Sequence, residues 1–388
     1  MNSTKGRCLV VGAGFAGAVH ARQLAEAGYE VVVIDKRDHI AGNAFDKVDD
    51  NGIRVHRYGP HLFHTNNDLV VKWISRFSDW TPYTHRVRAM LENHVYVPIP
   101  VNIDTINSVY ATELATEAEA RAFLATISDV IPAPANAAEY LRSKIGRRLT
   151  DLFFRPYTKK MWNLDLEDLD SAVVRRIPLR YDSNDRYFPD AKYEMLPASG
   201  YTKMFENILD HSNISVRLQT GFERGMEEDY EVCFNSMPID EYFGFVAGEL
   251  PYRSIRFHHR TCSLHDTRSW SVTNYTDASG FTRETWWHLL PGHIQDDTGR
   301  ATITVEEPCD YKENSCERYY PVKTSDGRYD SVYQVYKEMA KRTPEMIFIG
   351  RCGTYQYLDM DQVINQSLVG VNRWLLSREP AAVQLVAS

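Results

Sequence analysis

The chain has 388 residues, of which 43% are hydrophobic and 25% charged, and its net charge is −8. This length and composition predict a soluble globular protein of two or three domains, and the negative charge argues against a general nucleic-acid binder. The sequence has no run of 18 or more apolar residues that would indicate a membrane-spanning helix. Its six cysteines show neither a CxxC pair nor a metal-like spacing with histidine, so we expect reduced thiols, a cytoplasmic protein and no metal site.

The first predicted elements are a strand, a glycine turn, a helix and a second strand. The apolar run Cys8–Val11 precedes Gly-Ala-Gly-Phe-Ala-Gly at 12–17, and a stretch of small and apolar residues continues to Gly28, a natural helix stop. The β-branched run Val31–Ile34 then ends at Asp35. A glycine turn between strand and helix, followed by a strand with an acid at its end, is the dinucleotide-binding fingerprint in its required context.

Each glycine of this turn has a separate physical role. Gly12 permits the tight turn, Gly14 lets a pyrophosphate approach the backbone, and Gly17 lets the helix pack closely on the strand. The N-terminus of the predicted helix offers free N–H groups and a positive dipole end, which favour bound phosphates. We therefore expect a dinucleotide here rather than a plain strand–helix turn.

The cofactor is expected to be FAD rather than NAD. Asp35 can accept both ribose hydroxyls, and the segment Lys36–Asn43 places a second glycine loop, with Gly42, directly after that acid. A later strand over 346–349 leads to Gly350-Arg351 and then to Asp359 at the head of a predicted helix, a return typical of flavin proteins. The sequence has no second GxGxxG for a nicotinamide cofactor.

The remaining elements predict an α/β protein with an FAD-binding Rossmann-type core, a helical insertion domain and an antiparallel β-sheet domain. Residues 107–141 and 137–160 indicate helices, whereas residues 253–303 have the short alternations of antiparallel strands. We expect a discontinuous core, a helical domain with a mobile lid over 163–170, and a substrate domain. Their ranges are 1–75, 190–245 and 340–388 for the core; 100–175 for the helical domain; and 76–99, 176–189 and 246–339 for the sheet.

Two stretches are rich in aromatic and histidine side chains. Tyr-Gly-Pro-His-Leu-Phe-His-Thr occupies 58–65, and Phe-Phe-Arg-Pro-Tyr-Thr-Lys-Lys-Met-Trp occupies 153–162. On a helix, positions 154, 157 and 161 share a face, which is the usual pattern of core packing. The same residues could line a site for a sugar and a base, and the pattern alone leaves both readings open.

Taken together, these motifs resemble the bacterial UDP-galactopyranose mutases over nearly the whole chain. The resemblance is carried by GAGFAG at 12–17, RDHIAGN at 37–43, YGPHLFHT at 58–65, PYTKKMW at 156–162, RRIPLRY at 175–181, GYTKM at 200–204 and GRCGTYQYLDMD at 350–361. It implies an FAD protein, usually a homodimer, that converts a nucleotide-linked hexopyranose to its furanose. Reduced flavin is required, and the flavin N5 forms an adduct with the sugar while the UDP leaves and returns.

The resemblance also implies roles for individual residues. Arg176 and Arg253 match the arginines that bind the diphosphate, and His61 matches the histidine beside the flavin. The matched substrate-binding residues are Phe153, Tyr157, Trp162, Tyr187, Asn274, Arg283, Tyr320 and Tyr357. The matched cofactor-binding residues are Gly12, Gly14, Phe15, Ala16, Gly17, Asp35, Lys36, Gly42, Asn43, His61, Arg351, Tyr357, Leu358 and Asp359.

Several positions depart from the family pattern, and all lie in or near the sugar end of the expected site. Asn274 leads to Gly-Phe-Thr-Arg at 280–283 instead of Pro-Tyr-Thr-Arg, and Glu-Glu-Pro-Cys stands at 306–309. His85 occupies a position where several members have asparagine. The resemblance implies UDP-galactopyranose as the substrate. Because the departures lie at the sugar end, UDP-N-acetylgalactosamine and dTDP-fucopyranose are kept as alternatives. An FAD amine-oxidase-like oxidoreductase and a non-catalytic flavin- or nucleotide-sugar-binding protein are the competing classes.

Overall fold

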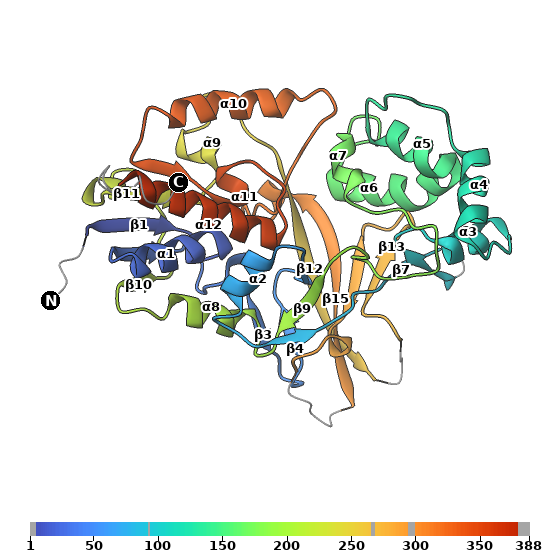
Figure 1. The fold of residues 1–388 in the computed structure, drawn as a ribbon, viewed down its shortest axis with the longest axis horizontal. Helices are drawn as coiled ribbons and strands as arrows, with labels where there is room; N and C mark the ends of the chain where they lie inside the picture. The colour runs from blue at the N-terminus through green and yellow to red at the C-terminus, as the bar shows by residue number, and fades with distance from the viewer. Residues whose placement is uncertain (1–4, 92–93, 265–267, 294–298, 379–388) are drawn as a thin grey trace.

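The structure is a computed structural model and describes residues 5–91, 94–264, 268–293 and 299–378. Its parallel sheet has the strand order β10 (Ile214–Arg217), β2 (Glu30–Ile34), β1 (Arg7–Val11), β11 (Val232–Asn235) and β17 (Met346–Phe348). All four neighbouring pairs are parallel. The strands come from both ends and the middle of the sequence, so the strands of this sheet are far apart in the chain (Figure 1).

Both faces of the parallel sheet are buried along β1, β2 and β11, whose residues are mostly apolar, whereas the edge strand β10 is largely exposed. Cys8 and Val10 pack with α1 (Phe15–Glu26), α8 (Tyr201–Leu209) and α12 (Met360–Ser377). Leu9 and Val11 point to the other face and pack with α9 (Ile239–Tyr242) and α10 (Arg328–Ala340). The range 246–339 was expected to belong to the substrate sheet, but most of α10 lies within it and packs against β17 and α9 of the core instead.

The second large sheet is mostly antiparallel. Its order is β16 (Tyr320–Pro321), β12 (Tyr252–Ser263), β15 (Arg300–Asp310), β14 (Arg283–Trp286), β13 (Val272–Tyr275), β7 (Val87–Met90) and β8 (Tyr96–Ile99). Only the β7–β13 pair is parallel among the pairs described. There are two smaller sheets among the described residues: β3 (Asp46–Val48) with β4 (Arg54–His56), and β5 (Phe63–Thr65) with β9 (Tyr193–Pro197) and β6 (Trp80–Pro82). The helix α2 (Asp68–Ile74) follows β5 in the chain.

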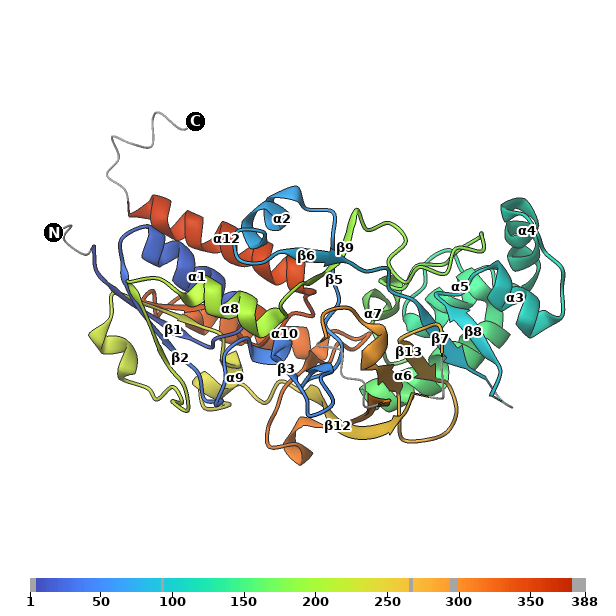
Figure 2. The same cartoon turned by 90° about the horizontal axis from the view of Figure 1, so that it is seen from below.

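The predicted helical region forms a separate cluster at the far end of the molecule from the chain termini (Figures 1 and 2). It contains α3 (Ile103–Tyr110), α4 (Glu117–Ile127), α5 (Ala137–Leu149), α6 (Arg155–Trp162) and α7 (Ser171–Arg175). Asn102, Thr116 and Asn136 cap the first three helices through their side-chain oxygens. A short π-helix over Thr150–Phe154 joins α5 to α6.

The α/β class with a parallel Rossmann-type core, a helical insertion and an antiparallel sheet is therefore confirmed. No helix in the described ranges is long and apolar enough to cross a membrane.

Candidate active site

A cavity of about 570 Å³ opens at the carboxyl ends of β1, β2, β11 and β17 and continues between the antiparallel sheet and the helical region. Ligands of open α/β sheets bind outside the carboxyl ends of the strands, and this volume is typical of small-molecule sites. We call the part next to the parallel sheet the cofactor half. The substrate half is the part lined by Tyr157, Arg176, Tyr187, Asn274, Arg283 and Tyr320.

The glycine turn of the cofactor half has the geometry that its sequence predicts. Gly12 has a φ of +98°, and an added Cβ would lie 2.0 Å from Ser236 Oγ. A Cβ on Gly17 would lie 1.8 Å from the Gly12 carbonyl oxygen, so only glycine allows this approach of helix and strand. Gly14 differs, because its Cβ would meet nothing closer than Gly42 Cα at 3.6 Å. The turn could accept a Cβ at Gly14 in ordinary van der Waals contact with Gly42, and both glycines line the cavity.

Asp35 holds the glycine turn as well as lining the cavity. Its Oδ2 accepts a hydrogen bond from the Ala13 amide at 2.8 Å, and its Oδ1 accepts one from the Arg37 amide at 2.9 Å. Each carboxylate oxygen has a further lone pair, so the side chain can still accept ribose hydroxyls. Lys36 and Asn43 line the same part of the cavity, and Asn43 Oδ1 accepts from Arg37 Nη1 at 2.9 Å.

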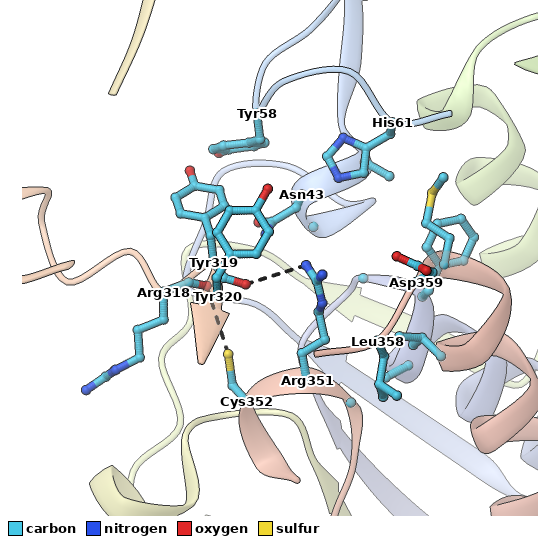
Figure 3. A pocket seen from close by; sticks show the side chains of 18 of the residues that line it. Asn43, Tyr58, His61, Arg318, Tyr319, Tyr320, Arg351, Cys352, Leu358 and Asp359 are labelled. Carbon is cyan, nitrogen blue, oxygen red and sulfur yellow. Dashed lines mark hydrogen bonds between the residues drawn. The ribbon is translucent and has the colours of Figure 1, made fainter. Parts of the chain in front are cut away.

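The C-terminal segment also lines the cofactor half, where Arg351, Leu358 and Asp359 lie across from Tyr58 and His61 (Figure 3). Asp359 caps α12 in a reciprocal capping box with Gln362, and Leu358 lies beside it in the cavity lining. Arg351 Nη1 donates to the Tyr319 carbonyl at 3.5 Å. Its Nε is buried, and within the described part of the chain it has no hydrogen-bond partner. A buried guanidinium donor without a partner is costly, so Arg351 is prepared to bind an anionic or carbonyl group in the cavity.

Sequence reasoning missed a cluster that covers the same part of the cavity. Arg37 forms an ion pair with Glu317, and its guanidinium lies 4.5 Å from the centroid of the Tyr58 ring. All three side chains line the cavity. Ser236 and Met237, directly after β11, line it too. Those two could have been found from the sequence, because residues that follow a buried parallel strand lie at the ligand-binding edge.

The substrate half combines arginines with tyrosine rings. Arg176 lies 4.2 Å from the centroid of the Tyr357 ring, and its Nη1 is 3.8 Å from Asp359 Oδ1. The Tyr320 and Tyr357 rings stack at 5.3 Å, and Arg351 lies 4.8 Å from the Tyr357 centroid. Cations packed over aromatic faces keep their charge available to an anion while their position is fixed. This half of the cavity is therefore suited to a ligand with strong negative charge.

Arg283 is the most firmly held of these cations. Its Nε and Nη2 donate to the two carboxylate oxygens of Glu306 at 2.9 and 2.8 Å. Arg283 and Glu306 lie opposite each other on β14 and β15, and Glu306 is 1% exposed. The bidentate pair fixes the plane of the guanidinium and leaves its Nη1 to face a ligand.

Three histidines meet where the two halves join. His61 Nδ1 lies 2.9 Å from the Gly59 carbonyl oxygen, and the His64 ring stacks on Phe188 at 3.6 Å. His85 is buried, and its Nδ1 has no partner among the described residues. Burial, together with the charges of Arg351 and Arg283, lowers the pKa of His61 to about 3, and burial and Arg283 lower that of His85 to about 3. Both rings are therefore neutral at physiological pH.

Comparison with known proteins identifies the family. The family model of UDP-galactopyranose mutase matches residues 152–357, and a model of NAD(P)-binding Rossmann-like domains matches residues 10–77. A probable UDP-galactopyranose mutase of Klebsiella pneumoniae is 36% identical over 379 residues, which is 95% of this chain and 94% of that protein. This chain belongs to the UDP-galactopyranose mutase family, a family of isomerases.

Other members and structures agree with that assignment. A dTDP-fucopyranose mutase of Escherichia coli is 35% identical over 377 residues, covering 93% of this chain and 96% of that protein. A crystal structure of reduced UDP-galactopyranose mutase has a TM-score of 0.74 at 16% identity and covers 97% of both chains. A putative protoporphyrinogen oxidase from Exiguobacterium has a TM-score of 0.67 at 14% identity over 97% of this chain, which shows a shared fold alone.

Three residues expected in the site of this mutase-family protein lie elsewhere. Within the described residues, the cavity lining includes neither Arg253 nor Phe153 nor Trp162. Phe153 is buried in the helical cluster, and Trp162, 7% exposed, contacts the site only through the Tyr320 and Tyr357 rings. Arg253 donates to main-chain carbonyls of α6. Arg176 and Arg283 therefore both line the cavity, whereas the described side chain of Arg253 is engaged by α6.

The expected lid over 163–170 is closely held in this structure. The expectation rested on the acidic and polar residues of this segment, but its leucines are interspersed among them. Leu166 and Leu169 are only 1% and 0% exposed. The segment also contacts the chain after β16, since the Ser325 amide donates to the Asp168 carbonyl at 2.9 Å. Arg155 binds Glu167 through two hydrogen bonds of 2.9 Å. Lid movement stays a prediction, and it would have to break these contacts.

Proposed function

We propose that this protein is a flavin-dependent mutase that converts UDP-galactopyranose to UDP-galactofuranose. The observation that supports this best is one continuous cavity with a glycine-lined dinucleotide half and a half rich in arginine and tyrosine. The first half suits a large cofactor, and the second suits the diphosphate of a nucleotide sugar. Their connection brings the reacting ends of the two ligands together, at the three histidines.

The proposed cofactor is FAD in its reduced form. The residues fit such a group, because the glycines of the turn at 12–17 and Gly42 line the cavity without side chains, and the Arg351 cation lines it as well. The proposed cofactor contacts are Gly12, Gly14, Phe15, Ala16, Gly17, Asp35, Lys36, Gly42, Asn43, His61, Arg351, Tyr357, Leu358 and Asp359, all of which line the cavity. When bound, the reduced flavin supplies the nucleophile that takes the anomeric carbon from the nucleotide.

Arg176 and Arg283 are proposed to bind the diphosphate. The nucleotide acquires negative charge as its bond to the sugar breaks, so each guanidinium would interact more strongly with the transition state than with the bound substrate. Tyr187, Tyr320 and Tyr357 line the same half and can donate phenolic protons to phosphate oxygens. Tyr157 and Asn274 are proposed to contact the remainder of the nucleotide.

The neutral histidines are proposed to handle sugar hydroxyls. If His61 Nδ1 carries its proton and donates to the Gly59 carbonyl, Nε2 is a lone-pair acceptor that can orient a hydroxyl in the cavity. A neutral ring does not compete with the arginines for the phosphates, and burial keeps it neutral. His85, which also lines the cavity, offers a further neutral ring.

A second substrate is supported by a specific relative. The dTDP-fucopyranose mutase of Escherichia coli is about as similar to this chain as the Klebsiella pneumoniae protein, at 35% against 36% identity. The same chemistry on dTDP-fucopyranose, or on UDP-N-acetylgalactosamine, is therefore the alternative for this site.

Product analysis tests the proposal. The purified protein, reduced with dithionite, is incubated separately with UDP-galactose, UDP-N-acetylgalactosamine and dTDP-fucose, and the products are resolved by chromatography. We expect the reduced protein to form a furanose product, with the highest yield from UDP-galactose. We expect no product with the oxidised protein. Equal turnover by oxidised and reduced protein would contradict the flavin mechanism. Reduction of an oxidised flavin by the substrate would indicate an oxidoreductase, and binding without product would indicate a binding protein.

We also propose a homodimer located in the cytoplasm. Family resemblance supports the dimer, and the scattered cysteines without pairing support the location. Sedimentation equilibrium over a range of protein concentrations checks the dimer, and a monomer at all concentrations would contradict it.

A further inference from the structure

The C-terminal end of α6 is held by an arginine from a distant strand. The last carbonyls of an α-helix have no partner within the helix and must be satisfied from outside. Lys159 O accepts from the Asn163 amide at 2.9 Å. Lys160 O and Met161 O accept from Arg253 on β12, through Nη2 at 3.3 Å and Nε at 2.9 Å.

Arg253 is well suited to this role by its charge and shape. Its side chain is 8% exposed, and its planar fork presents two donors to two successive carbonyls. A cation at a helix C-terminus also interacts favourably with the negative end of the helix dipole. The guanidinium is thereby engaged by backbone, which accounts for its absence from the described lining of the cavity.

α6 carries residues that face the nucleotide region. Tyr157 lines the cavity, and Trp162, the last residue of the helix, packs at 6.1 Å against the rings of both Tyr320 and Tyr357. Arg253 is also paired in register with Tyr320 across β12 and β16. One residue therefore connects the end of α6 to the strand that carries a second side chain of the site.

A second cation makes the same connection from the helix side. Lys160 Nζ donates to the carbonyls of Tyr275 and Asp277 at 2.9 and 3.0 Å, just after β13. The sheet thus binds α6 at two points, and of these two cations Arg253 is the one that donates to carbonyls of the last turn of α6.

We propose that Arg253 is a positioning residue, which fixes the C-terminal turn of α6 so that Tyr157 holds the nucleoside and Trp162 supports the Tyr320 and Tyr357 rings, and that it does not contact the diphosphate. This inference rests on the proposed function in that the ligand is taken to be a nucleoside diphosphate sugar. In this proposal Arg253 controls binding of the nucleoside, whereas Arg176 and Arg283 control binding of the diphosphate.

The test compares UDP with uridine, which lacks the diphosphate. Dissociation constants are measured for wild type, Arg253→Ala, Arg176→Ala and the control Arg256→Ala, with titration calorimetry for UDP and competition against UDP for uridine. Arg256 lies on the same strand but pairs with Glu307 and Glu313 away from α6. We expect Arg253→Ala to weaken UDP and uridine by the same factor, about tenfold. Arg176→Ala should weaken UDP alone, and Arg256→Ala should change neither.

A loss of UDP affinity in Arg253→Ala with unchanged uridine affinity would overturn the inference, because it would show a diphosphate contact. Arg253→Lys should recover part of both affinities, since one ammonium can still donate to a helix carbonyl, and this variant replaces the alanine variant if the latter does not fold. If wild type binds dTDP and thymidine better, the same comparison is made with that pair.

Amide hydrogen exchange tests the inference without any nucleotide. Peptides covering α6 should exchange faster in Arg253→Ala or Arg253→Lys than in wild type, and at the wild-type rate in Arg256→Ala. Unchanged exchange in α6 would overturn the positioning role. Failure of wild type to bind any nucleotide, with faster exchange in the variants, would contradict the proposed function and leave the positioning role standing.

Discussion

The cofactor half of the cavity is built from backbone, whereas the substrate half is built from side chains. In the first, Gly12 and Gly17 are required because any Cβ would collide with Ser236 or with the Gly12 carbonyl. In the second, Arg283 is set by the carboxylate of Glu306 and Arg176 by the Tyr357 ring. A change in the first half should therefore act in an all-or-none manner, whereas changes in the second should be graded.

The largest effect is expected in the glycine turn. Gly17→Ala should prevent stable folding or cost about 3 kcal/mol or more, because its Cβ would lie 1.8 Å from a carbonyl oxygen. Gly14→Val should fold, because the Gly14 φ of −83° suits any residue and its Cβ has room, but FAD affinity should fall by at least about a hundredfold. Thermal unfolding measures the stability of Gly17→Ala, and flavin absorbance measures the FAD bound by Gly14→Val. A yellow, wild-type-like Gly14→Val protein would contradict the placement of the pyrophosphate.

The next effect concerns the arginines of the substrate half. Removing one partner of a desolvated charge pair costs roughly 2–5 kcal/mol, or on the order of 10¹·⁵–10³·⁵ in rate. Arg176→Ala and Arg283→Ala should each lower kcat/KM by at least about tenfold while FAD stays bound. Arg180→Ala is the control, because Arg180 pairs with Asp182 outside the described lining. Near wild-type efficiency in both alanine variants would mean that the diphosphate binds elsewhere.

The same two variants should differ in stability. Arg283→Ala leaves Glu306 buried without its partner, which typically costs about 3–5 kcal/mol, and Glu306→Gln should restore part of this in the double variant. The Arg176 side chain is 42% exposed, so the Arg176→Ala protein should unfold at nearly the wild-type temperature. Equal melting temperatures for the two variants would show that the Glu306 pair does not hold β14 and β15.

Acid should destabilise the fold through histidines buried in the core and in the cavity wall. Burial lowers the pKa of His20, on α1, from 6.5 to about 4, and that of His85 to about 3. The unfolded chain takes up these protons first, so stability is full above pH 6.5 and is lost as the pH falls toward the folded-state values. Each histidine should cost roughly 2 kcal/mol by pH 5. Urea unfolding of wild type and His20→Asn at pH 7 and pH 5 measures this, and an equal loss in both proteins would contradict it.

The smallest effect is expected at Trp162. UDP binding should change its fluorescence, because the indole packs on Tyr320 and Tyr357 at the edge of the substrate half. Trp162→Phe identifies this signal among the seven tryptophans and should lower kcat/KM by less than about tenfold, since the ring lies outside the described cavity lining. An identical fluorescence response in Trp162→Phe would reject the assignment.

The outcome for individual residues shows how far sequence reasoning reached. Gly12, Gly17, Asp35 and the capping residue Asp359 have the local geometry that their motifs predict. Arg253 and Arg283 could not be separated in the same way, because both are arginines within the stretch 253–303 that predicts antiparallel strands. What separates them is which carbonyl or carboxylate lies opposite, and this depends on strand register and on where α6 packs. Trp162 and Phe153 were likewise chosen by motif, and burial in the helical cluster removes both from the described lining.

The sequence by itself determined the dinucleotide turn, the α/β class and the family, because these depend on short stretches in which spacing and backbone conformation are the whole signal. Tertiary structure alone decided which cations meet in the cavity, how tightly the segment over 163–170 is held, and that Arg37, Tyr58 and Glu317 cover the cofactor half. Those features join residues as far apart in the chain as Arg37 and Glu317. Such contacts arise from the packing of two sheets and a helical cluster, which no local pattern of residues encodes.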